Sequence, residues 1–291
     1  MLQILTNHSN EYLFERRDGL LVTQFPAVEH NFHCDVGLED VQFAVNNSRM
    51  LVANLSLASD GTPFEKSEYS DGTFVIPEKV DRLFQCGASV ILRGAHRFLP
   101  GIRTRVNELR RIWMCDVQAN LYVSHPNSIA TTPHFDPHDI LIYQVSGSKN
   151  WKVYDCAFKR PENWDSFKVE RHGYGDEIEE VLVDEGDLVL WPRGIVHQPV
   201  ASSFSIHIAF GIKSPSYKDL MIELINLMAL EDEDFRVNPR LQSSSAENVH
   251  AMLGLVEKLR EVLNDQEIGT RLLDEMLAYD FQGDSSEFSF R

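Results

Sequence analysis

The sequence is poor in cysteine, in long apolar runs and in basic charge. It has four cysteines among 291 residues, and their spacing suggests neither a zinc knuckle nor a disulfide framework. We therefore expect reduced thiols and a cytoplasmic protein. No segment approaches the roughly 20 consecutive apolar residues that a membrane-spanning helix needs, so the sequence predicts no membrane span.

The shortage of basic residues leaves the chain strongly acidic. It has 27 lysines and arginines against 44 aspartates and glutamates, which gives a formal net charge of -17. Such a charge repels polyanions, so nucleic acid is disfavoured as a partner, whereas a basic protein or peptide is favoured. Glu11, Glu15 and Asp18 interrupt the first 19 residues, and we expect no export signal there.

Short apolar runs alternate with turn residues from about residue 21 to residue 215, which predicts a mainly β fold, a sandwich or barrel decorated by helices. The polar stretch 157–180 is predicted to be a long insert between two strands, and we interpret it as a flap over the substrate. Helices are expected at 77–85 and 99–111. The runs that we expect to form strands are rich in β-branched and aromatic residues and cover 19–24, 49–55, 89–93, 118–124, 140–145, 151–154, 188–191 and 205–212.

Helical periodicity begins after Pro215. Apolar residues recur at spacings of three and four within 220–228 and within 249–263, and a polar run separates the two stripes. We therefore divide the chain into a β domain at 1–215 and a small helical domain at 216–291. The two stripes either bury each other or form the surface of a homodimer, and we favour the homodimer.

The main chemical motif is the His-Phe-Asp triplet at 134–136, together with a later histidine. Residues two apart on a strand project from one face, so His134 and Asp136 should aim at one point. Turn-forming glycines and a proline in 186–194 bracket a short strand, after which comes His197. Two imidazoles and one carboxylate hold a redox-active Fe(II) on one face and leave other positions open. The same ligand set can also hold zinc for hydrolysis.

Lys149 is the second clue to the chemistry. It follows the strand expected at 140–145 and a Ser-Gly-Ser turn, so a hairpin would fold it back beside the metal strand. A lysine that points into an apolar barrel is costly unless it meets an anion. The far carboxylate of a dicarboxylic cosubstrate would satisfy it while the other end chelates the metal. The alternative is a lysine that points into solvent from a tight turn.

In combination, these residues resemble the JmjC branch of the cupin superfamily, whose members are Fe(II)- and 2-oxoglutarate-dependent oxygenases. The resemblance covers about residues 119–212 and is closest to the ribosomal-oxygenase-like members. It implies a double-stranded β-helix, the jelly-roll fold of cupins, followed here by the small helical domain. The segments that carry it are the triplet at 134–136, Lys149 fifteen residues after His134, the Gly-Ser-Lys-Asn-Trp run at 147–151, the glycine-to-histidine segment at 186–197 and the block at 120–128.

By this resemblance, His134, Asp136 and His197 would bind iron. Lys149 would pair with the 5-carboxylate of 2-oxoglutarate, the cosubstrate that the family uses with O2.

Three further residues match family positions that contact the cosubstrate or line the pocket, namely Asn120, Tyr122 and Thr131. Their ordinary alternatives are a strand asparagine, a barrel tyrosine and a loop threonine. His207 resembles a family histidine on the last barrel strand, and a packed core histidine is an equal alternative. His138 is expected to lie outside the set of metal ligands.

The predicted activity is hydroxylation of an amino-acid side chain in a protein or peptide, with release of succinate and CO2. Hydroxylation of a free amino acid or natural product and demethylation of methyl-lysine are the alternatives within the same chemistry. From other classes, we consider a non-catalytic assembly module and a zinc or manganese isomerase, for which a buried Lys149 would have no use. The helical region is shorter than in full ribosomal oxygenases, which leaves the substrate open.

Overall fold

The structure, a computed structural model, describes residues 10–47, 49–155, 160–162, 174–239 and 245–265, together with residues 267, 270 and 274. The chain divides into two compact units. The first runs to Trp113 and continues over Val117–Lys213, and the second joins Met114–Asp116 to the chain from Ser214 onward. This division lies beside the predicted boundary at residue 215. That 216–291 fold as a domain of their own stays a prediction.

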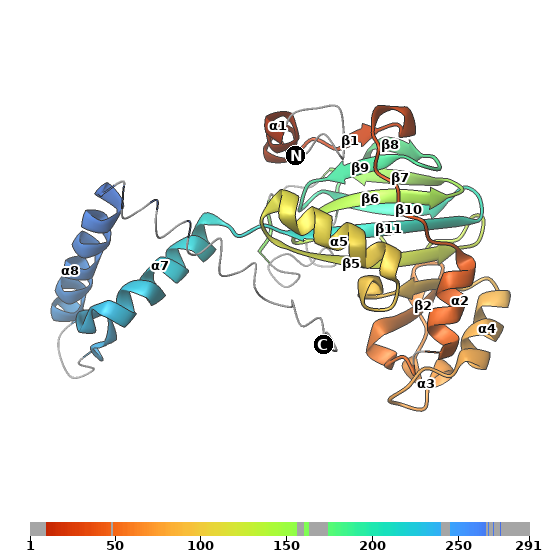
Figure 1. The fold of residues 1–291 in the computed structure, drawn as a ribbon, viewed down its shortest axis with the longest axis horizontal. Coiled ribbons are helices and arrows are strands. Elements are labelled where there is room, and N and C mark those ends of the chain that lie inside the picture. The colour runs from red at the N-terminus through yellow and green to blue at the C-terminus, as the bar shows by residue number, and fades with distance from the viewer. Residues whose placement is uncertain are drawn as a thin grey trace, which may run out of the picture. The chain divides into compact units, whose positions relative to one another are not determined.

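The strands of the first unit form two sheets (Figure 1). The larger sheet has the order β1-β9-β6-β11-β5-β4-β2-β3, and the smaller sheet has the order β10-β7-β8. The strands are β1 (Thr23–Phe25), β2 (Leu55–Ser59), β3 (Thr62–Pro63), β4 (Ser89–Leu92), β5 (Asp116–Ser124), β6 (Asp139–Ser146), β7 (Lys149–Tyr154), β8 (Glu177–Val183), β9 (Leu188–Trp191), β10 (Val196–Ala201) and β11 (Ser205–Lys213).

Successive strands pass back and forth between the two sheets, which is the path of a double-stranded β-helix. The chain crosses from β6 to β7, returns from β8 to β9, crosses again to β10 and returns to β11. Gly147 makes the first crossing at φ 65°, and a Cβ there would lie 1.9 Å from the carbonyl oxygen of Phe204. Only glycine fits this position, because the β6–β7 turn lies directly on the β10–β11 turn. The jelly-roll fold predicted from the sequence is confirmed.

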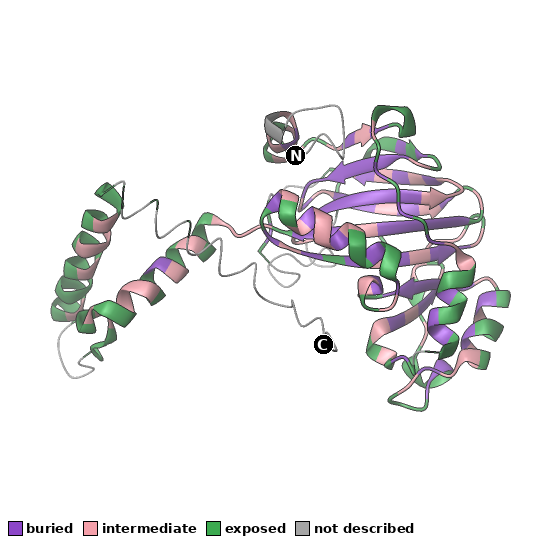
Figure 2. Cartoon of the chain, in the orientation of Figure 1, coloured by how far each residue is buried: buried purple, intermediate pink, exposed green. Residues whose placement is uncertain are grey.

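An apolar core fills the space between the sheets. Ile140 and Ile142 of β6 face Trp151 and Val153 of β7 and are buried with them. The opposite face of the larger sheet is covered as well, since Phe32 packs edge-on against Tyr143 of β6 and Phe210 of β11. Figure 2 shows the central strands of this sheet as buried. Both faces of the central strands are therefore shielded from water, which explains why the sequences of these strands are continuous apolar runs.

The helices of the first unit lie around these sheets. The helices expected at 77–85 and 99–111 are both present, as α4 (Pro77–Gln85) and α5 (Pro100–Trp113). The α5 helix buries Ile102, Val106 and Leu109 at spacings of four and three, as an amphipathic helix on a sheet should. The remaining helical segments of this unit are α1 (Asn10–Asp18), η2 (Ala27–Glu29), α2 (Leu38–Asn47), η3 (Val52–Asn54), α3 (Lys66–Tyr69) and η4 (Ala95–Arg97).

Two expected strands were wrong in part. The run at 19–24 contributes only Thr23 and Gln24 to β1, because Gly19 and the two residues after it close the last turn of α1 through backbone hydrogen bonds. The run at 49–55 contains the 3-10 turn η3, and its strand begins only at Leu55. Of the apolar residues that these runs leave outside a strand, Met50 is buried, whereas Leu21 and Leu51 are exposed.

The predicted flap at 157–180 needs a correction at its end. Residues 177–180 belong to β8 and pair with β7, so they are sheet and not insert. The acidic side chains of β8 lie on its exposed side, which is why the run looked like a polar loop. Most of the remaining stretch, 157–159 and 163–173, lies outside the described residues.

The second unit contains α7 (Tyr217–Glu231), η5 (Glu233–Arg236) and α8 (Ser245–Asn264). Ser216 and Asp219 form a capping box that begins α7 just after Pro215. Lys258 of α8 pairs with Asp232 and Asp234 around η5, at 2.5 and 2.6 Å. Among the described residues, no helix combines the length and the apolar character needed to cross a bilayer.

Candidate metal centre

The residues of the triplet and His197 meet at one end of the space between the sheets. The prediction that His134 lies in a regular strand is wrong: it lies in an irregular segment that makes a single bridge to His197. The amide of each histidine donates to the carbonyl of the other, at 3.1 and 2.8 Å. Phe135 turns to the opposite side and packs against Val196. The bridge between His134 and His197 thus keeps the side-chain alternation that the His-Phe-Asp triplet needs.

Three donor atoms converge within this segment. One atom from each of His134, Asp136 and His197 lies within 4.8 Å of the others. The Oδ2 atom of Asp136 is 3.6 Å from Nε2 of His197 and 3.9 Å from Nε2 of His134. Neighbouring ligands on an ion with bonds of about 2.1 Å lie roughly 3 Å apart, so a small closure would bring all three onto one metal.

Both imidazoles are held in the tautomer that a metal requires. Nδ1 of His134 is 2.8 Å from the carbonyl oxygen of Thr132, and Nδ1 of His197 is 3.0 Å from that of Ile195. A carbonyl only accepts, so each Nδ1 carries the proton and each Nε2 presents its lone pair to the centre. Burial, and the neighbouring His134, lower the pKa of His197 well below its usual value, so it stays neutral. Burial raises the pKa of Asp136, and a bound cation would reverse that effect.

The residues fit a divalent metal. The set is open, since three protein donors on one side leave the remaining positions to other ligands. His138 is not part of it: its ring packs against Gly211, where an added Cβ would lie 2.8 Å from its Cε1 atom. The position of His138 therefore agrees with its exclusion from the sequence-predicted ligands.

Lys149 points into the interior and is 1% exposed. Its Nζ donates to Ser124 Oγ at 3.0 Å and lies 6.0 Å from the centre of the Tyr122 ring. Burial lowers the pKa of Lys149 to about 7, and no carboxylate of the described residues offsets this. A buried ammonium that has only a hydroxyl for a partner is an incomplete site for an anion. The solvent-facing alternative for Lys149 is wrong.

Tyr122 and His207 lie beside this lysine. Their rings stack at 4.5 Å with an interplanar angle of 5°. Burial raises the pKa of Tyr122 to about 12, so its hydroxyl stays protonated and can donate. Asn120 is placed differently: its Oδ1 accepts from the amide of Gly94, and its side chain acts against the rise in the pKa of Tyr122 that burial causes. Asn120 is thus partly a structural residue.

Several buried polar atoms have no hydrogen-bond partner among the described residues. Those close to the centre are Nδ1 of His207 and the indole nitrogens of Trp151 and Trp191, and Oγ1 of Thr131 is another such atom. Both tryptophan rings lie close to His197, with centroids 5.6 and 5.0 Å from its ring. Unpaired buried groups are rare unless a ligand or water completes them. They fit a polar ligand that occupies this end of the interior.

Ser124 is a residue of the site that was not predicted from the sequence. It is two residues beyond Tyr122 on β5, so strand alternation places both side chains on the inner face. That spacing was a usable signal. The buried hydroxyl of Ser124 also accepts from Ser89, which is in turn bonded to Ser128, so the ammonium of Lys149 is anchored in a hydrogen-bonded serine chain.

The fold and this donor set together define a double-stranded β-helix with a two-histidine, one-carboxylate centre. Residues 94–220 match the JmjC domain family. The chain is thus similar over this segment to JmjC-domain proteins, and it resembles their ribosomal-oxygenase-like members.

Relatives with curated names include insect proteins described as bifunctional lysine-specific demethylase and histidyl-hydroxylase NO66. The one from Drosophila persimilis is 28% identical over 193 residues, and the one from Culex quinquefasciatus is 29% identical over 181 residues. The matches cover 65% and 60% of this chain but only 28% of each relative. The chain thus spans a small part of these longer proteins.

Solved structures give the same fold at lower identity. The ribosomal oxygenase YcfD from Escherichia coli, in complex with cobalt and succinic acid, aligns with a TM-score of 0.59 at 17% identity. Its complex with cobalt and 2-oxoglutarate aligns with a TM-score of 0.57 at 18% identity. Both alignments cover 94% of this chain, and they cover 71% and 72% of the YcfD chains.

Proposed function

We propose that this protein is an Fe(II)- and 2-oxoglutarate-dependent dioxygenase that hydroxylates an amino-acid side chain in a protein or peptide. The observation that carries the proposal is the pairing of an open set of three metal donors with a buried lysine that has no anionic partner among the described residues. A zinc hydrolase or an isomerase would need the donors but not the lysine. A silent assembly module would need neither.

Different side chains would bind the metal and the cosubstrate. His134, Asp136 and His197 would hold Fe(II) through Nε2, Oδ2 and Nε2, because both Nδ1 protons are tied to backbone carbonyls. Lys149 would bind the far carboxylate of 2-oxoglutarate, with Ser124 holding the ammonium in place. When bound, Fe(II), 2-oxoglutarate and O2 supply the oxidation that converts a C–H bond to C–OH, with release of succinate and CO2.

The apolar surroundings protect this chemistry. Trp151 and Trp191 are almost fully buried, at 3% and 1% exposure, and they exclude water from the side of His197. Thr131, Asn120 and Tyr122 are proposed as further contacts to the cosubstrate. Of these, Thr131 has an unpaired buried hydroxyl, and the pKa of Tyr122 keeps its hydroxyl a donor.

A protein substrate is supported by the names of the relatives, since NO66 proteins are described as histidyl-hydroxylases and lysine demethylases and YcfD as a ribosomal oxygenase. The net charge of -17 supports a basic substrate. Demethylation is the second candidate, because the same site would serve it and the NO66 name includes it.

We also propose a cytoplasmic location and a homodimer through α7 and α8. The support for the dimer is that Val249, Met252 and Leu253 of α8 are more than half exposed.

Turnover of 2-oxoglutarate tests the proposal. The protein, reconstituted with Fe(II) without oxygen, is mixed with 2-oxoglutarate, air and a fraction of basic cellular proteins, and succinate is measured by NMR. Mass spectrometry of the proteins then separates hydroxylation, which adds one oxygen atom, from loss of methyl groups. Asp136→Ala is the inactive control. Absence of both succinate formation and 2-oxoglutarate binding by the wild-type protein would support the assembly module instead.

A further inference from the structure

Asp139 is a buried carboxylate that the reaction itself does not use. It is the first residue of β6 and is 6% exposed. Alternation along β6 places it on the same face as Leu141 and Tyr143, which is the outer face of the larger sheet and opposite to the interior. Burial raises its pKa, while the charges of Arg17, Arg193 and His138 act in the other direction. A carboxylate placed there at this cost calls for a structural or functional reason.

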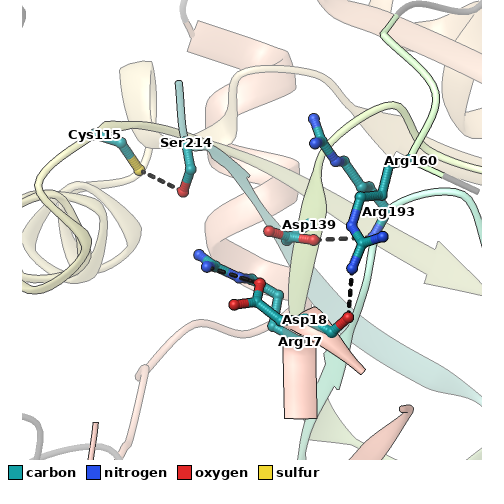
Figure 3. A network of polar contacts seen from close by, with 7 residues as sticks. All are labelled: Arg17, Asp18, Cys115, Asp139, Arg160, Arg193 and Ser214. Carbon is teal, nitrogen blue, oxygen red and sulfur yellow. Dashed lines mark hydrogen bonds and ion pairs between the residues drawn. The ribbon is translucent and has the colours of Figure 1, made fainter. Parts of the chain in front are cut away.

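The contact of Asp139 is with the turn that leads to His197. Its Oδ1 accepts the backbone amide of Arg193 at 2.9 Å, as Figure 3 shows. The next amide in the chain, that of Gly194, donates to the carbonyl of Asp136 at 3.0 Å. Two successive amides of one turn are thus fixed to the segment that carries the triplet.

This turn sets the distance between the two halves of the metal centre. Gly194 has a φ of 88°, and His197 follows three residues later with both of its backbone hydrogen bonds to His134. Asp136 and His197 come from segments far apart in sequence, and the Arg193 and Gly194 amides are the first links between them on this side. If the Arg193 amide lost its acceptor, the turn could open and carry His197 away from Asp136.

The first helix brings a positive charge towards Asp139. Arg17, in the last turn of α1, lies near Asp139 in Figure 3, and its guanidinium is 3.0 Å from Asp18 and 4.9 Å from the centre of the Phe14 ring. Its positive charge and that of the Arg193 guanidinium act against the rise in the pKa of Asp139 that burial causes. The hydrogen bond from the Arg193 amide is what orients the carboxylate.

We infer that Asp139 is a positioning residue for the metal centre. Through the Arg193 amide it fixes the 192–194 turn, so that Asp136 and His197 can bind one ion. The inference rests on the proposed function, because it needs a metal at these residues. It concerns a residue that touches neither the metal nor the substrate.

Asp187 offers a matched control at the other end of β9. It is also a buried carboxylate, 7% exposed, and it accepts from the amides of Ala27 and Asp184 and from the side chain of Gln24, at 2.8 to 3.1 Å. Its loss should destabilise the fold at least as much as the loss of Asp139. The turn that it holds precedes β9 and lies at the opposite end of that strand from Arg193 and Gly194.

Cobalt(II) binding to the metal-free protein tests the inference without any turnover. Affinity is measured by calorimetry, and the visible absorption of bound Co(II) reports its coordination. We expect Asp139→Ala to weaken Co(II) roughly 10- to 100-fold, as removal of outer-shell partners does, and to change the spectrum. Asp139→Asn keeps an acceptor oxygen and should bind within about threefold of the wild type. Asp187→Ala should melt at a lower temperature but keep the wild-type affinity and spectrum.

A second measurement needs no substitution. In the wild-type protein, Co(II) should slow hydrogen exchange at the amides of Arg193 and Gly194 and leave those of Gly186 and Asp187 unchanged. Wild-type Co(II) binding by Asp139→Ala with an unaltered spectrum, or equal losses in Asp139→Ala and Asp187→Ala, overturns the positioning role and leaves the proposed function standing. Failure of the wild-type protein itself to bind Co(II) would overturn both.

Discussion

Replacing Lys149 by methionine should have opposite effects on the stability of the protein and on its binding of 2-oxoglutarate. Methionine fills a similar volume without the charge. The ammonium is 1% exposed, and its hydrogen bond to Ser124 does not offset burial, since the pKa falls from 10.5 to about 7. The lysine therefore costs stability in the free protein and gains its value only when an anion is bound.

The pKa values give the sign and size of the stability effect. A lysine whose pKa is lower in the folded state than in the unfolded state destabilises the fold fully below the folded value, and this cost fades as pH rises towards the unfolded value. The difference between 10.5 and about 7 corresponds to roughly 5 kcal/mol in acid at 1.36 kcal/mol per pKa unit. About 4 kcal/mol remains at pH 7 and about 2 kcal/mol at pH 9, so the ligand-free Lys149→Met variant should gain up to these amounts.

The effect on binding should run the other way. Removing one partner of a buried charge pair costs about 2–5 kcal/mol, which is roughly 30- to 5,000-fold in the dissociation constant of 2-oxoglutarate. Thermal unfolding with and without 2-oxoglutarate and Mn(II), between about pH 6 and pH 9, measures both effects. Lys152→Met is the control, because this lysine is on the outer face of β7 and pairs with Glu177 at 2.8 Å. If Lys149→Met melts below the wild type at pH 7 and still binds 2-oxoglutarate normally, the assignment of this lysine is wrong.

Three further outcomes are expected. Asp136→Ala should weaken Co(II) by more than the roughly 100-fold upper range of outer-shell changes, and calorimetry that shows intact binding would contradict the proposed ligand set. Gly147→Ala should cost several kcal/mol in urea unfolding because its Cβ meets Phe204, whereas Gly72→Ala, also at positive φ but with open space, should cost only about 1 kcal/mol; equal losses would exclude the clash as the cause. Leu253→Glu, at a residue that is 57% exposed on α8, should leave the circular dichroism unchanged and yield monomers in light scattering; persistent dimers would remove this face from the interface.

Most strands of the larger sheet were predictable from the sequence, but their order in the sheet was not. Runs such as 140–145 and 205–212 are long, apolar and β-branched, and they are strands in the structure as β6 and β11. The run at 49–55 is also apolar but contains a 3-10 turn before β2, since backbone hydrogen bonds with Thr73 and Val75 hold this part of the chain instead of a ladder. Apolar composition therefore indicates candidate strands, and tertiary partners decide which of them join a sheet.

The site shows a similar division. The spacing within 134–136 predicted that the side chains of His134 and Asp136 project to the same side. The turn residues before His197 predicted a sharp bend that leads to a third donor. The sequence left Lys149 undecided between solvent and interior, because a lysine after a hairpin turn does either. Burial between two sheets decided it, since β7 turns Lys149 to the same side as Trp151.

Local structure was thus predictable from the sequence, because side-chain alternation, turn-forming residues and apolar content act between neighbouring residues. The sequence by itself determined that this is a mainly β protein with a His-Phe-Asp triplet, a partner histidine and a helical end. Only the tertiary structure decided that Ser124 anchors Lys149 and that Asp139 holds the turn before His197. Each of these contacts joins residues that are brought together by the packing of strands, and no local pattern in the sequence encodes which strands will meet.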